Sequence, residues 1–409
     1  MKRLFIILFC FLYFSVSTYA CTSVLISGKL TKDGRPLLLK NRDTDQLNNR
    51  IEYFKGEYYN FIGLVNSNIK DKQVWSGNNS AGFCIINTAS YNLNYDDVDK
   101  SLMDREGYFM YKVLSNCKNL YEFEEFLNEM STPYYLESNF GVMDAEGNAA
   151  FYEVSNNKWC KYDVNDKRIA PEGYLVYTNF SFSGKENDGL GYIRYDAATK
   201  VMKESVDHKV KYDPEWIFDN ISRNFYNSIL DINLRKDINK LSNTGFYYDK
   251  DFIPRHSTAS SVIFQGVNKG ENPNLTVMWT ILGYPPLGIA VPVMCASETN
   301  QPFFMCSTSD NENSKLCEVV LSLKEKVYSI KRGNGESYIN FKLMYNEKGD
   351  GYSQILNDLE KKNINVFQGI LFDWRKNGFQ KEEFNKFIEN YSTSFFKYYE
   401  SLINLQDKY

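Results

Sequence analysis

Hydrophobic residues near the start of the chain fall into two short runs on either side of a polar turn. The first run opens Cys21-Thr-Ser-Val-Leu-Ile-Ser, and the second, Pro-Leu-Leu-Leu-Lys-Asn-Arg, ends at Asp43. Short apolar runs around an Asp-Gly pair are typical of a β-hairpin. If the turn centres on Asp33 and Gly34, Asp43 pairs with Val24, and Cys21 and Asp43 lie at one end of the hairpin. Since both runs are mostly apolar, we expect a sheet covered on both faces.

Further runs of the same kind predict more strands and several helices. Strand-like runs lie at 82–87, 139–144, 149–154, 174–180, 260–266 and 276–282. Hydrophobic residues at helical spacing fill 104–130, with a break near Lys118 and Asn119, and also 215–241 and 351–405. Strand runs separated by long helical blocks predict stacked layers of helix and sheet, an α+β architecture.

The chain divides into three segments. We expect residues 1–20 to be removed, 21–310 to form the main domain and 311–409 to form a helical C-terminal extension packed on that domain. Lys, Glu, Asn and aromatic residues recur at helical spacing in the extension, and no Pro- or Ser-rich linker precedes it. A separate partner-binding module over 311–409 is the alternative. Neither an internal repeat nor a low-complexity tract is evident.

The first twenty residues have the pattern of a signal peptide. Lys2 and Arg3 precede an apolar run over 4–16, and small or polar residues lead to Ala20. The run is shorter than the roughly 18 apolar residues that indicate a membrane span, and no comparable run recurs downstream. We therefore expect signal peptidase to cut after Ala20, leaving an exported protein, periplasmic or secreted, with no stable membrane span. An uncleaved anchor is the alternative.

Composition limits the partners and cofactors of the exported chain. Residues 1–20 hold two of the 47 basic side chains and none of the 51 acidic ones, so 45 basic and 51 acidic side chains remain, a net charge of −6. Acidic residues are interleaved throughout, and nucleic acid is not an expected partner. Since His208 and His256 are the only histidines, a histidine-rich zinc site is excluded, and we expect no metal and no cofactor. A homo-oligomer is left open.

The remaining cysteines do not settle a disulfide pattern. Apart from Cys21, six stay in the exported chain, which is enough for three disulfides in an oxidising compartment. Buried free thiols are an equally reasonable reading.

Export would leave Cys21 as the first residue, so that one residue carries both a thiol and a free amine. An α-amine has a reference pKa of about 7.7 to 8.0 and is therefore suited to accept the thiol proton near neutral pH. A single cleavage after Ala20 could thus activate an enzyme.

Several motifs resemble one enzyme family. The opening Cys21-Thr-Ser, the Asp-Gly turn and Lys40-Asn-Arg-Asp43 resemble the N-terminal hairpin of cysteine N-terminal-nucleophile (Ntn) hydrolases, most closely the isopenicillin N acyltransferases, choloylglycine hydrolases and penicillin V acylases. A dipeptidase family with a Cys-Thr-Thr opening is a more distant resemblance. The likeness is strongest over 21–90 and continues to about residue 300. It implies a four-layer αββα sandwich in which Cys21 attacks an amide carbonyl, its own α-amine relays the proton and Asp43 holds that amine.

The same resemblance implies further site residues. Asn87, which ends the run Asn-Ser-Ala-Gly-Phe-Cys-Ile-Ile-Asn, matches the asparagine that donates to the oxyanion. Asn179, in Thr-Asn-Phe, matches a second active-site asparagine, and together the two asparagines would stabilise charge on the carbonyl oxygen. Arg255, before His-Ser-Thr-Ala-Ser-Ser, resembles the distal arginine that closes the pocket. Taken singly, each is also an ordinary strand-end, turn or ion-pair residue, so the assignment depends on the joint pattern.

Two cations are candidates to support the thiolate. Lys40 lies where the choloylglycine hydrolases place an arginine, three residues before the aspartate. Arg42 is adjacent to Asp43 and points to the other face if the strand is regular. The sequence does not decide between them.

The function that these features predict is an exported amidohydrolase. It would cleave a linear C–N amide bond of an N-acylated small molecule or short peptide through Cys21. One alternative is an acyltransferase of the isopenicillin N type, and another is a non-catalytic exported binding lipoprotein with a lipid on Cys21. A Cys-His hydrolase that uses His256 is a third.

Overall fold

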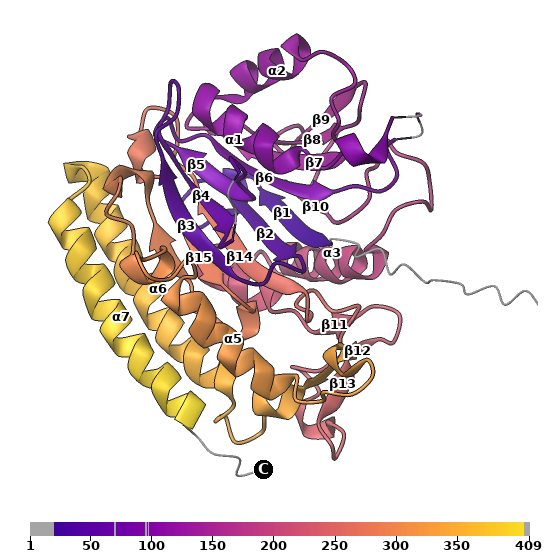
Figure 1. The fold of residues 1–409 in the computed structure, drawn as a ribbon, viewed down its shortest axis with the longest axis vertical. Helices are drawn as coiled ribbons and strands as arrows, with labels where there is room; N and C mark the ends of the chain where they lie inside the picture. Colours follow the sequence, from indigo (N-terminus) through magenta and orange to yellow (C-terminus); the bar gives the residue numbers. More distant parts are fainter. Residues whose placement is uncertain (1–19, 69–70, 95, 97, 405–409) are drawn as a thin grey trace, which may run out of the picture.

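Two antiparallel sheets stacked face to face form the centre of the protein in the computed structural model, which describes residues 20–68, 71–94, 96 and 98–404 (Figure 1). The first sheet has the strand order β10-β1-β2-β14-β15-β16. Its strands are β1 (Cys21–Ile26), β2 (Leu37–Asp43), β10 (Tyr174–Tyr177), β14 (Thr258–Gln265), β15 (Val277–Leu282) and β16 (Val291–Val293). Every residue of β1 and β2 is buried, which confirms the prediction of a sheet covered on both faces.

The second sheet is an antiparallel meander of seven strands in chain order. These are β3 (Asn49–Phe54), β4 (Phe61–Asn66), β5 (Ser76–Asn79), β6 (Cys84–Ala89), β7 (Ser138–Met143), β8 (Ala149–Val154) and β9 (Trp159–Asp163). Alternate residues of β6 serve different cores, because successive side chains of a strand point to opposite faces. Ile86 joins the core that includes the first sheet, whereas Ile85 joins a second core with the helices outside this sheet.

Helices cover both outer faces (Figure 1). α1 (Glu106–Asn116) and α2 (Leu120–Glu129) cover the second sheet, and α3 (Tyr192–Asp207), α5 (Lys315–Val327), α6 (Tyr352–Asn377) and α7 (Lys381–Asn404) lie on the side of the first. The short α4 (Pro214–Ile217) leads into a π-helix at Phe218–Ser222. Two small strand pairs stand apart, β11 (Tyr226–Asn227) with β12 (Ile232–Asn233) and β13 (Phe246–Tyr248) with β17 (Tyr338–Asn340). The result is the predicted α+β, four-layer αββα sandwich with helices after it.

Most of the predicted elements are confirmed. The runs 139–144, 149–154, 260–266 and 276–282 are strands within one or two residues, and 104–130 is two helices that break at Lys118 and Asn119. Asn119 is the N-cap of α2, where its side chain accepts a hydrogen bond from the Glu122 N–H at 2.9 Å. The predicted signal peptide lies outside the described residues, apart from Ala20. No helix in the described part of the chain is long and apolar enough to cross a membrane.

The register of the first hairpin differs from the prediction. Cys21 pairs with Arg42, so Asp43 lies opposite Ala20 instead of Val24, and the Asp43 N–H donates to the Ala20 carbonyl at 2.8 Å. The cause is a longer connection, in which a 3₁₀ turn at Gly28–Leu30 precedes the Asp-Gly pair. The shift is an even number of residues and therefore keeps each side chain on its predicted face. Cys21 and Asp43 remain neighbours at one end of the hairpin.

The predicted helices over 215–241 are wrong beyond Ser222. Asparagine side chains there bond to nearby backbone and compete with helical hydrogen bonds. Asn224 accepts from the Tyr226 N–H at 2.7 Å, and Asn227 accepts from the N–H groups of both residues at 229 and 230 at 3.0 Å. These turns produce the β11–β12 pair in place of a helix.

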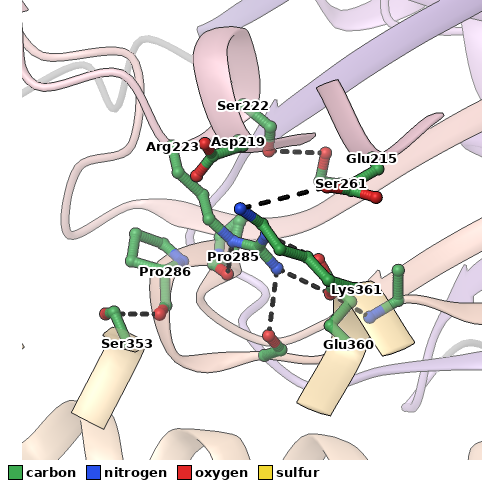
Figure 2. Close-up of polar contacts among 12 residues, drawn as sticks. Glu215, Asp219, Ser222, Arg223, Ser261, Pro285, Pro286, Ser353, Glu360 and Lys361 are labelled. Atoms are coloured by element: carbon green, nitrogen blue, oxygen red, sulfur yellow. Dashed lines mark hydrogen bonds and ion pairs between the residues drawn. The ribbon is translucent and has the colours of Figure 1, made fainter. Parts of the chain in front are cut away.

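The helices after residue 311 pack on the same core as the first sheet. A buried ion pair ties α6 to the segment after the π-helix, because Arg223 binds both carboxylate oxygens of Glu360 at 2.7 and 2.8 Å (Figure 2). The boundary at residue 310 stays a prediction. The seven cysteines of the described residues are all free thiols.

Candidate active site

The backbone of Cys21 is held at the very start of β1. Its N–H donates to Asn179 Oδ1 at 2.9 Å, and its carbonyl oxygen accepts from Arg194 Nη1 at 2.6 Å. Arg194 also donates to Asn179 Oδ1 at 2.8 Å and to the Thr22 hydroxyl at 2.8 Å. One arginine and one asparagine therefore fix both the nitrogen and the carbonyl of the candidate nucleophile.

Two cations lie on the face of β2 that Cys21 shares. Directly paired residues of antiparallel strands point their side chains to the same face, and Cys21 pairs with Arg42, two residues from Lys40. Arg42 donates to Asn49 Oδ1 at 2.7 Å and lies over the Trp75 ring at 4.8 Å. This arrangement places both predicted thiolate-supporting cations on the side of the sheet toward which the thiol points.

Lys40 is almost completely buried between the sheets. Its ammonium donates to the Trp75 carbonyl at 2.8 Å and to Asn87 Oδ1 at 2.7 Å. Burial lowers the pKa of Lys40 to about 7, while negative charge on Cys21 acts to raise it. Lys40 thus couples electrostatically to the thiol and fixes the orientation of the Asn87 amide.

Asp43 lies on the opposite face of β2. Its carboxylate accepts from the Thr258 hydroxyl at 2.6 Å and from Arg255 Nε at 2.7 Å. Burial acts to lower the pKa of Arg255, but the charges of Asp43 and Asp249 outweigh it and raise that pKa. A charged arginine therefore anchors Asp43 beside the peptide bond that joins Ala20 to Cys21.

The two asparagines make different contacts. Asn87 Nδ2 donates to the Ser138 hydroxyl at 3.2 Å, and because an amide nitrogen carries two hydrogens, it has a second one for an oxyanion. Asn179 instead turns its oxygen toward the Cys21 nitrogen, and its Nδ2 donates to the Ala89 carbonyl at 2.8 Å. This geometry favours Asn179 as a holder of the Cys21 nitrogen, whereas the oxyanion role of Asn87 stays a prediction.

The histidine of the alternative Cys-His mechanism lies in different surroundings. The His256 ring packs edge-on against Tyr328, with centroids 4.8 Å apart. Burial, and next the charge of Lys324, lowers the pKa of His256 to about 3. The ring is therefore neutral at physiological pH and is engaged in packing.

Sequence reasoning missed Arg194 and Thr258. Arg194 lies in the first turn of α3, a helix that the sequence analysis did not predict. A cation is electrostatically unfavourable at a helix N-terminus, and an arginine there after Gly191 was a usable signal of a special role. Thr258 belongs to the run that follows Arg255, and its importance depends on a strand pairing across more than two hundred residues.

The side chains around Cys21 are those of a site for carbonyl chemistry. Within the stretches that the structure describes, no three His, Cys, Asp or Glu side chains gather as ligands for an ion. The groups gathered at Cys21 are a thiol, hydrogen-bond donors and cations, which suit nucleophilic attack on a carbonyl and stabilisation of negative charge.

Comparison with solved structures finds similar folds at low identity. An N-acylethanolamine-hydrolyzing acid amidase ortholog from Caenorhabditis elegans is 18% identical, with 60% of this chain and 92% of that chain covered and a TM-score of 0.38. A conjugated bile acid hydrolase from Clostridium perfringens is 13% identical, with 64% and 89% covered and a TM-score of 0.40. A penicillin V acylase from Agrobacterium tumefaciens is 12% identical, with 67% and 86% covered and a TM-score of 0.36. No curated protein matches the chain.

A protein-family model also matches the chain. The model of the acyl-coenzyme A:6-aminopenicillanic acid acyl-transferase family matches residues 30–244, more than half of the chain. The matched region begins after Cys21 and contains Lys40, Asp43, Asn87 and Asn179. The protein therefore belongs to the acyl-coenzyme A:6-aminopenicillanic acid acyl-transferase family, whose members are Ntn enzymes that act on amide bonds.

Proposed function

We propose that this protein is an exported amidohydrolase whose nucleophile is Cys21, exposed by cleavage after Ala20. The proposal depends on two hydrogen bonds to the backbone of Cys21, the first residue of β1. Asn179 accepts from its nitrogen, and Arg194 donates to its carbonyl. An ordinary strand residue needs no such pair of buried polar partners. Once the peptide bond to Ala20 is cut, the same nitrogen becomes an amine on the residue that carries the thiol.

The proposed chemistry uses that amine as the base. The Cys21 thiol gives its proton to the α-amine, and the sulfur attacks the amide carbonyl to form a tetrahedral oxyanion. Asn179 Oδ1 and Asp43 keep the amine in place, and Asn87 Nδ2 donates to the oxyanion, an interaction typically worth a few kcal/mol. The C–N bond breaks as the ammonium returns its proton to the leaving amine, which leaves a thioester on Cys21.

A water molecule completes the cycle. The α-amine takes a proton from water, the hydroxide attacks the thioester carbonyl, and the C–S bond breaks to release the carboxylic acid and the free thiol. Lys40 and Arg42 lower the cost of negative charge on sulfur in both halves of the reaction. If an amine takes the place of water, the same intermediate gives acyl transfer, the activity for which the family is named.

The substrate that we propose is the linear amide of an N-acylated small molecule or short peptide. Export rests on the signal-like pattern over 1–20. Outside the cytoplasm water is the abundant acceptor, and hydrolysis is therefore favoured over transfer.

Export and maturation are tested by the intact mass of the full chain after expression in a host that secretes it. The expected mass is that of residues 21–409 with an unmodified cysteine at the N-terminus. A diacylglyceryl adduct would support the binding lipoprotein instead, and a chain that begins at any other residue would contradict the proposal.

Catalysis is tested on a panel of N-acyl amides with Cys21→Ala and Cys21→Ser. We expect Cys21→Ala to lower kcat/KM by at least about 10³-fold, since the covalent step is lost. Cys160→Ala is the matched control, because Cys160 is a free, half-buried thiol on β9 of the other sheet, and its activity should stay within about twofold of the parent. Undiminished turnover in both Cys21 variants would exclude the proposed nucleophile, and loss of activity in His256→Ala would favour the Cys-His alternative. An added amine acceptor separates transfer from hydrolysis by the ratio of the two products.

A further inference from the structure

Helix α5, the first helix of the C-terminal extension, contacts residues that hold the candidate site on both faces of β2. It lies outside the region matched by the family model. We propose that α5 is a positioning element of the active site. At its C-terminal end, Lys324 holds the loop 249–258, which contains the residues that bind Asp43. At its N-terminal end, Ser314 and Cys317 hold Asn49, the first residue of β3, which accepts from Arg42. The inference rests on the proposed function of Cys21 and adds to it a role for the extension.

Lys324 acts on the loop from Asp249 to Thr258. Its ammonium donates to the His256 carbonyl, and the His256 N–H donates to Asp249 Oδ2 at 2.5 Å. The Tyr328 hydroxyl, just after α5, also donates to Asp249, at 2.8 Å. The His256 peptide unit is thus held on both sides through α5, directly between Arg255 and Thr258, the two residues that bind Asp43.

The burial of Lys324 needs an explanation beyond packing. The residue is 3% exposed, and its nitrogen lies 5.8 and 5.9 Å from the ring centroids of Tyr284 and Tyr328. An ammonium in such surroundings is costly, and methionine would fill the space without that cost. Burial lowers the pKa of Lys324 to about 8, while the charges of Asp249, Cys317 and Asp43 act to raise it. The positive charge therefore acts on the carboxylates of the site across a low-dielectric interior.

The N-terminal end of α5 supports the other face. Cys317 Sγ accepts from the Asn49 N–H at 3.4 Å, and the Ser314 hydroxyl donates to the Asn49 carbonyl at 3.1 Å. Asn49 in turn accepts from Arg42, the residue paired with Cys21. Both backbone polar groups of Asn49 are therefore held by α5, and its side chain orients the guanidinium on the thiol face.

Two features keep α5 close to the first sheet. Gly283, at the end of β15, has a φ of +77°, and a Cβ there would lie 2.7 Å from Val320 of α5, so only glycine permits this approach. The helix also packs on α7, and α6 is fixed by the Arg223–Glu360 pair (Figure 2). The extension is thereby anchored at places other than the catalytic contacts.

The test compares Lys324→Met with Lys326→Met in the mature protein. Lys326 lies two residues away on α5 and also donates to a backbone carbonyl, that of Ile403 at 2.6 Å in α7, so it matches Lys324 in residue type, helix and contact. We expect Lys324→Met to lower kcat at least about tenfold with KM within twofold, because positioning of Asp43 matters in the transition state and not in substrate binding. We expect Lys326→Met to keep kcat within twofold of the parent. Equal kcat in the two variants would overturn the inference.

A second measurement needs no substrate. The rate of Cys21 alkylation by iodoacetamide at pH 7 should fall about threefold in Lys324→Met, since the α-amine that takes the thiol proton depends on Asp43, and the loop that anchors Asp43 loses a support. A fall in that rate in a protein that hydrolyses no amide would support the positioning role and overturn the proposed function. Unchanged alkylation and unchanged kcat in an active enzyme would overturn the positioning role alone.

The contact between Cys317 and Asn49, at the N-terminal end of α5, gives a second test if Lys324→Met does not fold. Cys317→Ala removes the acceptor of the Asn49 N–H, and Cys117→Ala removes an equally buried thiol at the end of α1, in the second core. We expect only Cys317→Ala to slow Cys21 alkylation and to lower kcat, by about threefold. Equal behaviour of the two alanine variants would contradict the inference.

Discussion

Two arginine–carboxylate pairs in this protein bury similar charges but are completed differently. Arg223 gives one donor to each oxygen of Glu360, and its remaining contacts go to the carbonyls of Pro285 and Gly288 at 3.0 and 3.2 Å. Asp43 receives only one contact from Arg255, and its other oxygen accepts from Thr258. In the first pair Glu360 also accepts from the Ala290 N–H at 2.6 Å, and the pair joins α6 to the main domain (Figure 2). The second lies next to the Ala20–Cys21 peptide, since the Asp43 N–H donates to the Ala20 carbonyl, and the proposed amine would need a carboxylate there.

Of the changes to these ion pairs, replacement of Asp43 should lower activity the most. We expect Asp43→Asn in the mature protein to lower kcat/KM by about 10²- to 10³-fold, because the amine loses its charged partner while the size of the side chain is kept. The free energy of unfolding should fall less than in Glu360→Gln, because the Arg255 side chain is 16% exposed whereas that of Arg223 is 1% exposed, and Thr258 can still donate to the amide oxygen. Retention of half of the activity would show that the Asp43–Arg255 pair has no catalytic part.

Replacing Glu360 should have the opposite profile. We expect Glu360→Gln to lower the free energy of unfolding by about 3–5 kcal/mol, because Arg223 is left as an unpaired buried charge. The folded protein should keep kcat within about threefold of the parent. Urea unfolding and steady-state kinetics on the same preparation measure both. A stable Glu360→Gln protein with impaired catalysis would reverse the distinction between the two pairs.

Lys40 extends the comparison to a buried cation with no ion pair among the described residues. Its folded pKa of about 7 lies below the ordinary value of 10.5, so above pH 7 the unfolded chain binds a proton that the folded chain has released. Stability should therefore rise with pH, and the full cost of the buried charge should remain below pH 7. Relative to Lys40→Met, we expect a gain of about 1–2 kcal/mol in the free energy of unfolding between pH 7 and 8.5. A pH-independent difference between the two proteins would contradict this value of the pKa.

An exposed pair gives the smallest expected effect. Lys32 and Asp213 are 2.6 Å apart, but the lysine side chain is 60% exposed. Lys32→Ala should change the free energy of unfolding by no more than about 1 kcal/mol and leave kcat unchanged. Asp213 is unsuitable for this test because it also caps α4. The measurement is urea unfolding at low and high salt. A larger loss of free energy of unfolding would mean that burial does not explain why the Arg223–Glu360 pair matters more than the Lys32–Asp213 pair.

The sequence was sufficient for the layers of the fold and for the neighbourhood of Cys21 and Asp43. Apolar runs on both arms of the first hairpin identified a buried sheet. The predicted turn centre was wrong, but it displaced the pairing by an even number of residues, so each side chain was still assigned to the correct face. The asparagine-rich turns after Ser222 were misread as helix because hydrophobic spacing carries no information on side-chain bonds to nearby backbone.

The contacts that complete the site come from distant parts of the chain. Arg194 of α3 donates to the Cys21 carbonyl, and Lys324 of the extension donates to the His256 carbonyl, in the loop from Asp249 to Thr258. Hydrophobic periodicity identifies which faces are buried, but it does not identify which distant helix lies against them. In α5 the pattern indicated a packed helix, while its polar contacts required the tertiary structure.

The place of β14 in the first sheet has a consequence for the timing of assembly. β2 has β1 on one side and β14 on the other, and the partners of Asp43 lie at and just before Thr258. A nascent chain that has not yet reached position 265 thus exposes a bare edge of β2 and contains a cysteine whose neighbouring carboxylate has no anchor. We therefore expect the proposed reactivity of Cys21 to require β14, and a proteolytic fragment that ends before β14 to lack it.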